Sequence, residues 1–410
     1  MKLSSRIGTA DPLAGQLPDQ LAPPALPAEW GVAEHRPGRS RPRRAPWVIA
    51  ALGVGCLLAA LLAVALPSSR TSHTAFAETF RVSSVSGQPA PSPLVNASVR
   101  ILRQRLSTPE LRGWTVESAR AHSIRLSCAA NCQAYGSPAA VSVVQPGQLL
   151  IYDWEVNVLD AQCRPRPASE DVTGAAAGGL PSAASTTYYR AVLRASRCPE
   201  RHYDVMSRAT PVYYAVDGAH ERVVSGPEPS KLAAVAAARA SSPRLDLGDL
   251  GVVTVLPGTT VVMAHYEHDA PRDDNNAQWY VLRDRPALTG HDVTNSRLRL
   301  HQRTPSVAIS FTPEGQQRWR AVTRGIAERG TAQSRAAQPG SATFQHLAIA
   351  LDQRLLTVPY IDVHRNPDGL DGRDGTVIGG GFTRASANAL VALLKSGELP
   401  ARLSPAPSYP

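Results

Sequence analysis

The clearest hydrophobic patterns lie near the end of the chain, from Phe344 to Leu403. In residues 346–352, large aliphatic side chains alternate with alanine, and this period of two predicts a strand with one apolar face. A short turn leads to a second apolar run at 355–361, and a Gly-rich apolar run follows at 377–382. The pattern therefore predicts a strand hairpin and a further strand in this region.

A helix is predicted at 384–395, where apolar residues recur at helical spacing. Thr383 can accept a hydrogen bond from an amide that opens the helix, and Lys395 stands in the last turn. Gly397 can adopt the left-handed conformation of a helix cap, and Pro400 cannot continue a helix. These signals define both ends of the helix. Its apolar face comprises Ala387, Leu390 and Leu394.

An amphipathic helix is predicted at 96–106, followed by strands at 114–118 and 123–128. The apolar stripe of this helix comprises Val95, Val99, Leu102 and Leu106. The order helix, strand, strand, with the helix at 384–395 as a return partner, suggests a split α/β base that holds a long inserted segment.

Residues 148–156 are apolar enough for a buried strand that ends in a polar turn, where Asp153 and Glu155 flank Trp154. Carboxylates two positions apart in a strand share one face, so an acid/base pair is one interpretation. The favoured alternative is a solvent-facing acidic edge beside a packed tryptophan.

Residues 161–250 consist of Ala-, Ser-, Gly- and Pro-rich sequence around short helical runs at 186–196 and 229–240. We interpret them as an insertion without chemistry of its own. Regular order resumes with apolar runs at 252–256 and 260–266, which a Pro-Gly pair joins as a predicted hairpin.

Five segments carry a resemblance to a known family. They are Tyr280 to Gly290, with Asp284, Arg285, Pro286, Leu288, Thr289 and Gly290; Val307 to Gly315; Leu347 to Asp352; Gly381-Phe382-Thr383; and Gly397-Glu398-Leu399-Pro400. In order and spacing they resemble the first periplasmic domain of SecD/SecDF protein translocase subunits, over residues 278–403. The sequence departs from the family pattern at Ser386, where an acidic residue is usual, at Val391, where a small one is usual, and at Glu398, where alanine is usual.

The resemblance implies an α+β fold with a split ferredoxin-like α/β base at 94–160 and 380–405. The insertion 161–250 and an α+β head subdomain at 251–379 interrupt this base. The expected core of the head comprises Val307, Ile309, Phe311, Trp319, Val322 and Ile326.

One segment indicates the compartment. Residues 47–66 carry no charge, and a helix of this length spans the ~30 Å hydrocarbon core of a bilayer. Arginines crowd into 36–44, whereas Arg70 is the first charge afterwards, so the N-terminus is expected in the cytoplasm and the folded part outside. A cleaved signal peptide is the alternative, because Ala63-Val64-Ala65 has the form of a cleavage site, and a lipid anchor at Cys56 is less favoured.

Two segments that flank the predicted membrane helix are expected to lack a fold. Residues 1–46 are Pro-rich with little apolar periodicity, which predicts a disordered cytoplasmic tail. Its arginines set the topology or, alternatively, also bind anionic lipid headgroups. Residues 67–93 are rich in Ser, Thr and Pro and are interpreted as a linker.

The composition limits the partners. With 410 residues, of which 43% are apolar, the chain can form more than one folded unit. The net charge of +10 comes almost wholly from arginine, and no basic run is interleaved with aromatic residues, so nucleic-acid binding is not expected. No small-molecule substrate is evident. The expected partners are the lipid bilayer and, through the resemblance, translocated polypeptides or the Sec translocase.

The five cysteines fall into two groups, with Cys56 in the predicted membrane helix and four others outside, where disulfides persist. The four allow three connectivities. Spacing favours one pair between Cys128 and Cys132 and another between Cys163 and Cys198. Histidine or further cysteine at ligand spacing is absent near them, so a zinc site is not expected.

Two acidic segments could be drawn as metal sites. Residues 265–274 combine histidines and carboxylates but lack the order His-Glu-x-x-His, which favours a hydrated loop. Residues 362–374 lack the ligand order of a calcium loop, which favours an Asx- and Gly-rich turn. Motifs for nucleophilic serine or phosphate-binding loops are absent, so we expect no enzyme, no cofactor and no metal.

SecD continues beyond this domain into a transmembrane bundle, whereas this sequence stops at Pro410, so no proton-driven motor is expected. The leading hypothesis is a single-pass membrane protein whose extracytoplasmic domain assists protein export by binding translocated polypeptide or a translocase partner. A structural or signalling cell-envelope protein that reuses the fold is the alternative, and an anchored hydrolase is a third.

Overall fold

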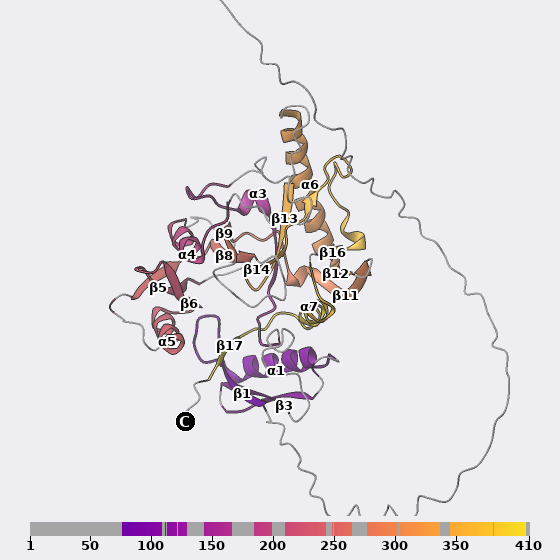
Figure 1. The fold of residues 1–410 in the computed structure, drawn as a ribbon. Helices are drawn as coiled ribbons and strands as arrows, with labels where there is room; N and C mark the ends of the chain where they lie inside the picture. Colours follow the sequence, from indigo (N-terminus) through magenta and orange to yellow (C-terminus); the bar gives the residue numbers. More distant parts are fainter. Residues whose placement is uncertain are drawn as a thin grey trace, which may run out of the picture. The chain divides into compact units, whose positions relative to one another are not determined.

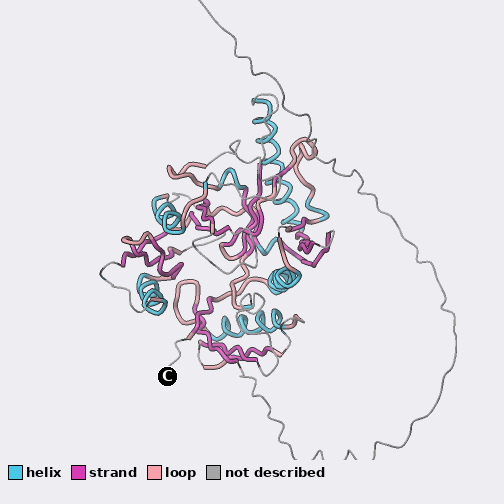
Figure 2. Tube along the Cα trace, viewed as in Figure 1, coloured by secondary structure: helices cyan, strands magenta, loops and turns pink. Residues whose placement is uncertain are grey.

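The computed structural model describes residues 76–108, 111, 113–120, 122–128, 143–165, 184–198, 210–242, 248, 250–264, 277–301, 304–336, 345–379 and 381–406. All of them belong to the compact unit of residues 69–410. These residues form four sheets with helices packed against them (Figure 1), and Figure 2 distinguishes the helices from the strands. The α+β class predicted from the sequence is therefore confirmed.

A four-stranded antiparallel sheet contains the first and last described strands in the order β17-β1-β3-β2. Its strands are β1 (Phe76–Ser83), β2 (Trp114–Ser118), β3 (Ser123–Cys128) and β17 (Arg402–Pro405). Helix α1 (Ser92–Leu106) packs on one face with the predicted apolar stripe, and all four stripe residues are buried. The predictions of α1, β2 and β3 are confirmed.

Strand β1 lies within residues 67–93, which the sequence analysis interpreted as a linker. The linker interpretation is wrong for residues 76–83 because Phe80 and Val82 point into the core beneath α1, where they are 2% and 0% exposed. Both edges of β1 are paired, with β17 on one side and β3 on the other, so its backbone groups are satisfied.

The largest sheet has the order β10-β4-β13-β14-β8-β9, and β15 also pairs with β13. Its strands are β4 (Leu149–Asp153), β8 (Thr259–Ala264), β9 (Gln278–Arg283), β10 (Leu288–Thr289), β13 (Gln345–Leu351), β14 (Arg354–Thr357) and β15 (Tyr360–Ile361). The sequence analysis assigned β4 to the base at 94–160, but β4 pairs with β13 and β10 in this sheet.

Strand β13 is buried on both faces, so the prediction of a single apolar face is wrong. The leucine and isoleucine side chains of 347–351 belong to one core cluster, which includes Trp319. The alternating alanines belong to a second cluster on the other face, which includes Tyr152 and Tyr280. Alanine at these positions leaves room for the aromatic side chains.

A three-stranded sheet comprises β11 (Val293–His301), β12 (Thr304–Phe311) and β16 (Thr376–Ile378). The long helix α6 (Pro313–Ala336) follows β12, and α7 (Arg384–Ser396) packs against β11 and β12 (Figure 1). The expected core of the head is confirmed: all six predicted residues are in one cluster, with Val322 partly buried.

The buried face of α7 points toward the core cluster around Trp319 rather than toward the four-stranded sheet. Ala387, Leu390 and Leu393 belong to the cluster around Trp319, and the predicted Leu394 is only partly buried. The same helix also contacts α1, so it lies between α1 and the sheet that contains β11 and β12 (Figure 1). Residues after it, Leu399 and Ala401, return to the core of the four-stranded sheet.

The segment 161–250 has regular structure of its own. It contains α4 (Tyr188–Arg197), β5 (Val212–Asp217), β6 (Arg222–Glu228) and α5 (Lys231–Ser241), and β5 pairs with both β6 and β7 (Leu250–Val255). The predicted hairpin is wrong: β7 pairs with β5, whereas β8 pairs with β9. The connection at Pro257-Gly258, where Gly258 has φ +100°, takes the chain from one sheet to another.

The predicted disulfide bond between Cys163 and Cys198 is present. It links the chain before α4 to the end of that helix. The pairing of Cys128 with Cys132 stays a prediction because Cys132 lies outside the described residues.

We expect the double substitution Cys163→Ser/Cys198→Ser to lower the free energy of unfolding by about 3 to 4 kcal/mol. The disulfide bond restricts the conformations of the unfolded chain across a sequence separation of 35 residues. The stabilisation that comes from this restriction increases with loop length. Urea denaturation under oxidising conditions measures the change, with Cys56→Ser as the control. A loss below about 1 kcal/mol would contradict the prediction.

Along the described part of the chain, no helix is both long and apolar enough to cross a membrane. The predicted tail at 1–46 and the predicted membrane helix at 47–66 both lie outside that part.

Candidate functional site

Two of the motif segments meet where the chain crosses from the four-stranded sheet to the large sheet. We call this place the neck and define it as Arg105, residues 143–148, Asp352 and residues 396–399. The neck joins α1, the start of β4, the β13–β14 turn and the end of α7 through hydrogen bonds. Positions far apart in the sequence are therefore held together here.

Arg105 lies at the centre of the neck and is 1% exposed. Its guanidinium donates hydrogen bonds to the carbonyl oxygens of Val143, Gln145, Pro146 and Gly397 and to Oγ of Ser396. Burial lowers the pKa of Arg105 to about 10, although nearby carboxylates oppose the shift. One side chain of α1 thus fixes the crossing segment and the end of α7.

Asp352 holds the crossing segment from the opposite side. It occupies the tight turn after β13 with φ +51°, and its two carboxylate oxygens accept the backbone N–H groups of Gly147, at 3.0 Å, and Gln148, at 2.8 Å. Burial raises the pKa of Asp352 above its ordinary value, whereas these two hydrogen bonds and Arg105 oppose the shift. Asp352 therefore positions the backbone of the crossing segment at Gly147 and Gln148.

The motif residues before β11 also support local structure. Asp284 is 3% exposed, and its Oδ1 accepts the hydroxyl of Tyr152 at 2.9 Å. Leu288 is buried in β10, opposite Ile151. Thr289 donates its N–H to Oδ2 of Asp292 at 2.8 Å and caps the short 3-10 helix η5 (Gly290–Asp292).

The last motif segments define α7. Thr383 caps the helix as predicted, because its Oγ1 accepts the N–H of Ser386 at 3.1 Å. Oγ of Ser386 in turn accepts the N–H of Thr383 at 3.0 Å. Serine thus completes the capping box at a position where the family pattern has an acidic residue. Gly397 ends the helix with φ +79°, and Leu399 N–H donates to Pro146 O at 2.8 Å. Of the remaining motif residues, Phe382 is buried, Pro286 and Pro400 are half-buried, and Arg285 and Gly381 are exposed.

A pocket of about 270 Å³ opens beside the neck, and we call it the neck pocket. It is lined by one apolar residue, Leu150, and by Gln148, Thr289, His291, Asp292, Arg318 and Glu398. The neck pocket therefore brings Thr289 and Glu398, which lie in two separate motif segments, close to the start of β4. Thr289 and Glu398 lie in segments that carry the resemblance, but no local pattern in the sequence predicts that they share a cavity.

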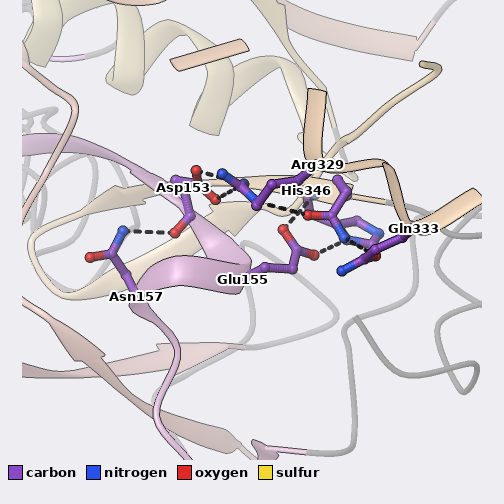
Figure 3. Close-up of polar contacts among 7 residues, drawn as sticks. Asp153, Glu155, Asn157, Arg329, Gln333 and His346 are labelled. Carbon is purple, nitrogen blue, oxygen red and sulfur yellow. Dashed lines mark hydrogen bonds and ion pairs between the residues drawn. The ribbon is translucent and has the colours of Figure 1, made fainter. Parts of the chain in front are cut away.

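A second polar cluster joins β4, α6 and β13 (Figure 3). Nη2 of Arg329 lies 2.6 and 2.7 Å from the two carboxylate oxygens of Asp153. Glu155, on the short helix α3 (Trp154–Asn157), accepts both the backbone N–H of His346 at 2.8 Å and its ring Nδ1–H at 2.6 Å. Gln333 accepts a hydrogen bond from Gln345 in the same cluster.

Both interpretations of Asp153 and Glu155 are wrong. Asp153 ends β4, whereas Glu155 lies in α3, so the two carboxylates face different partners (Figure 3). Their side chains are 14% and 3% exposed, so they do not form a solvent-facing edge. Burial raises the pKa of Asp153 above its ordinary value, and Arg329 opposes the shift. The cluster is a buried structural network.

Of the two acidic segments considered as metal sites, only residues 362–374 belong to the described part of the chain. Residues 265–276 lie outside the described residues. In 362–374, the carboxylates of Asp362 and Asp371 accept backbone N–H groups one turn ahead, as in the predicted Asx-rich turn. Within the described ranges, no group of three or more metal-ligating side chains is gathered.

Sequence reasoning missed Arg105, Arg329 and His346. Arg105 offered one signal, since it follows Leu102 by three positions and so falls on the buried side of α1. The pairs of Arg329 and His346 with β4 and α3 span 176 and 191 residues, and no local pattern encodes them.

Comparison with known proteins identifies part of this architecture. Residues 264–401 match the family model of the SecDF P1 head subdomain. The protein translocase subunit SecD of Synechocystis sp. is 30% identical over 131 residues, which cover 32% of this chain and 25% of that protein. The SecD subunit of Rickettsia typhi is 30% identical over 132 residues, covering 32% and 21%. The chain thus spans about a quarter of the length of the curated relatives it matches.

Two solved structures are similar at low identity. A structure of SecDF, a membrane component that enhances protein export, has a TM-score of 0.39 at 17% identity, covering 82% of this chain and 100% of that one. SecDF in its super-membrane-facing form also has a TM-score of 0.39 at 17% identity, covering 80% and 30%.

Proposed function

We propose, from the premise that residues 264–401 form a SecDF P1 head subdomain, that this protein assists protein export from outside the cytoplasmic membrane. In this proposal the folded unit binds translocated polypeptide or a partner in the Sec translocase. The observation that carries the proposal is the head match, which contains the neck residues Asp352, Gly397 and Leu399.

The proposal includes a split base. The order β1, α1, β2, β3, then α7 and β17, with the sheet order β17-β1-β3-β2, supports a ferredoxin-like base into which the other sheets are inserted. The position of α7 between α1 and the head supports a base and head that are connected through the neck. The uncharged run at 47–66 supports a single membrane anchor, with the folded unit outside the cytoplasm.

The test is crosslinking in cells that express the full chain. A photo-reactive residue at Gln148, in the neck pocket, is expected to crosslink an exported polypeptide that is stalled during translocation, or a subunit of the translocase. A second photo-reactive residue at the exposed Leu232 on α5 is the control for random encounter. The crosslinked protein is identified by mass spectrometry.

Localisation is tested in the same cells. A membrane-impermeant amine reagent, applied to spheroplasts, is expected to label Lys395 at the end of α7 as readily as in lysed cells. The proposal fails if Lys395 is labelled only after lysis. It also fails if Gln148 yields no more crosslinks to exported or translocase proteins than Leu232 does.

A further inference from the structure

The neck pocket has one acidic wall that is not neutralised by a direct partner. Asp292 is already engaged, because its Oδ2 accepts the Thr289 N–H at 2.8 Å and lies 3.5 Å from Nη1 of Arg318. No hydrogen bond or ion pair joins the Glu398 carboxylate to another described side chain or backbone group. Among the described residues that line the pocket, Glu398 is therefore the carboxylate without a direct partner.

The surroundings of Glu398 favour a cation. Burial raises the pKa of the Glu398 carboxyl above its ordinary value; the charges of His291 and Arg105 oppose this shift and that of Asp352 adds to it. Glu398 is an exposed residue of the pocket lining, so a cation placed against its carboxylate would form a solvent-screened ion pair. An anion would face Glu398 directly, and the one arginine of the pocket, Arg318, already faces Asp292.

The size of the neck pocket suits a single side chain. Its volume of about 270 Å³ is below the roughly 300 to 1,000 Å³ that is typical of sites for drug-sized ligands. Leu150 supplies an apolar wall beside the polar ones. Lysine and arginine combine an apolar stem with a charged tip, and this matches the mixed lining.

We propose that the neck pocket binds a lysine or arginine side chain of the translocated polypeptide, with Glu398 as the residue that determines this preference. The proposal rests on the proposed function, and it goes further by naming the chemical class that the site selects. Glu398 stands where the family pattern has alanine, so this preference is a property of this chain rather than of the resemblance.

The overall charge of the protein cannot produce the same preference. The net charge of +10 repels a cationic peptide at long range, so any gain from lysine has to come from a local site.

The test uses the purified full-length protein in detergent and fluorescently labelled unfolded peptides. Three peptides differ at one central position, which is Lys, Gln or Glu. Fluorescence anisotropy is expected to show the Lys peptide binding about five-fold more tightly than the Gln peptide, which is the upper end of what a solvent-exposed ion pair contributes. The Glu peptide is expected to bind least tightly.

Two variants assign the preference to one side chain. Glu398→Ala restores the residue of the family pattern, and Glu398→Gln keeps the shape while removing the charge. Both are expected to bring the ratio of Lys to Gln affinity close to one. Glu117→Ala, on the exposed face of β2, is the matched control and is expected to keep the preference.

The outcomes separate this inference from the proposed function. Equal binding of the Lys and Gln peptides by the wild-type protein overturns the inference and leaves polypeptide binding in place. A preference for the Glu peptide, or a lysine preference that persists in Glu398→Ala, also overturns it. Absence of binding by all three peptides overturns polypeptide binding itself and the inference with it.

Discussion

Replacing Arg105 with alanine is expected to lower the free energy of unfolding by about 3 to 5 kcal/mol. The guanidinium donates five hydrogen bonds within the neck, four of them to backbone carbonyl groups. Each buried acceptor that loses its partner costs about 1 to 3 kcal/mol, and local rearrangement or water entry recovers part of the sum. Urea denaturation followed by circular dichroism measures the change.

Two further variants define the cause. Arg103 lies on the same helix with an exposed side chain, so Arg103→Ala is the matched control and is expected to change stability by less than about 0.5 kcal/mol. Arg105→Lys keeps the charge but loses the forked geometry, and it is expected to fall between the wild type and Arg105→Ala. If Arg105→Ala and Arg103→Ala unfold at the same urea concentration, the neck does not depend on Arg105.

Replacing Glu155 with alanine is expected to lower the free energy of unfolding by about 3 kcal/mol. The carboxylate accepts both N–H groups of His346, and both side chains are almost fully buried, with 3% and 1% exposed. The substitution leaves two buried donors without an acceptor and also opens a small void. Urea denaturation compares the variant with Glu328→Ala, which removes an exposed carboxylate from α6 and is expected to be nearly neutral.

A double-mutant cycle isolates the contact between the two side chains. The combined variant Glu155→Ala/His346→Ala is expected to be less destabilised than the sum of the single variants by at least about 1 kcal/mol, because both single variants lose the same ring contact. Additive effects would show that Glu155 stabilises α3 independently of the His346 ring.

Elements with local signals could be predicted from the sequence. Helix α7 has its cap at Thr383 and its stop at Gly397, and both signals act within a few residues of the helix ends. Strands β2 and β3 alternate over their whole length and end at polar turns, and their predicted bounds match the structure. The six core residues along β12 and α6 were expected from the family resemblance, and they share one cluster.

Partner choice between strands could not be predicted in the same way. The runs that form β7 and β8 are separated by a turn signal, but β7 joins β5 and β8 joins β9. Adjacent position in sequence favours a hairpin, but the connection at Pro257-Gly258 carries the chain from one sheet to another, although β7 and β8 contribute to the same core cluster. Strand β1 was missed because the residues around it are rich in Ser, Thr and Pro. Its buried positions Phe80 and Val82 nevertheless alternate with polar residues, as in a strand.

The candidate site was predictable only in part. The motif residues Asp352 and Gly397 could be selected from the resemblance, but not their contacts: Asp352 accepts the backbone N–H groups of Gly147 and Gln148, and Gly397 accepts a hydrogen bond from Arg105. Arg105 and Gly397 are 292 residues apart in sequence. Such pairings are set by the tertiary fold, and no local sequence pattern indicates them.

The pairing of β1 with β17 has a consequence for how the chain matures. Ser83 lies opposite Arg402, so one edge of β1 stays uncovered until β17, which is far along the chain, has been synthesised. Contacts of such long sequence separation form slowly, and an uncovered edge is a template for strands of other molecules. The nascent β1 therefore passes through a period of exposure to aggregation, which ends only when β17 has been synthesised and has paired with it.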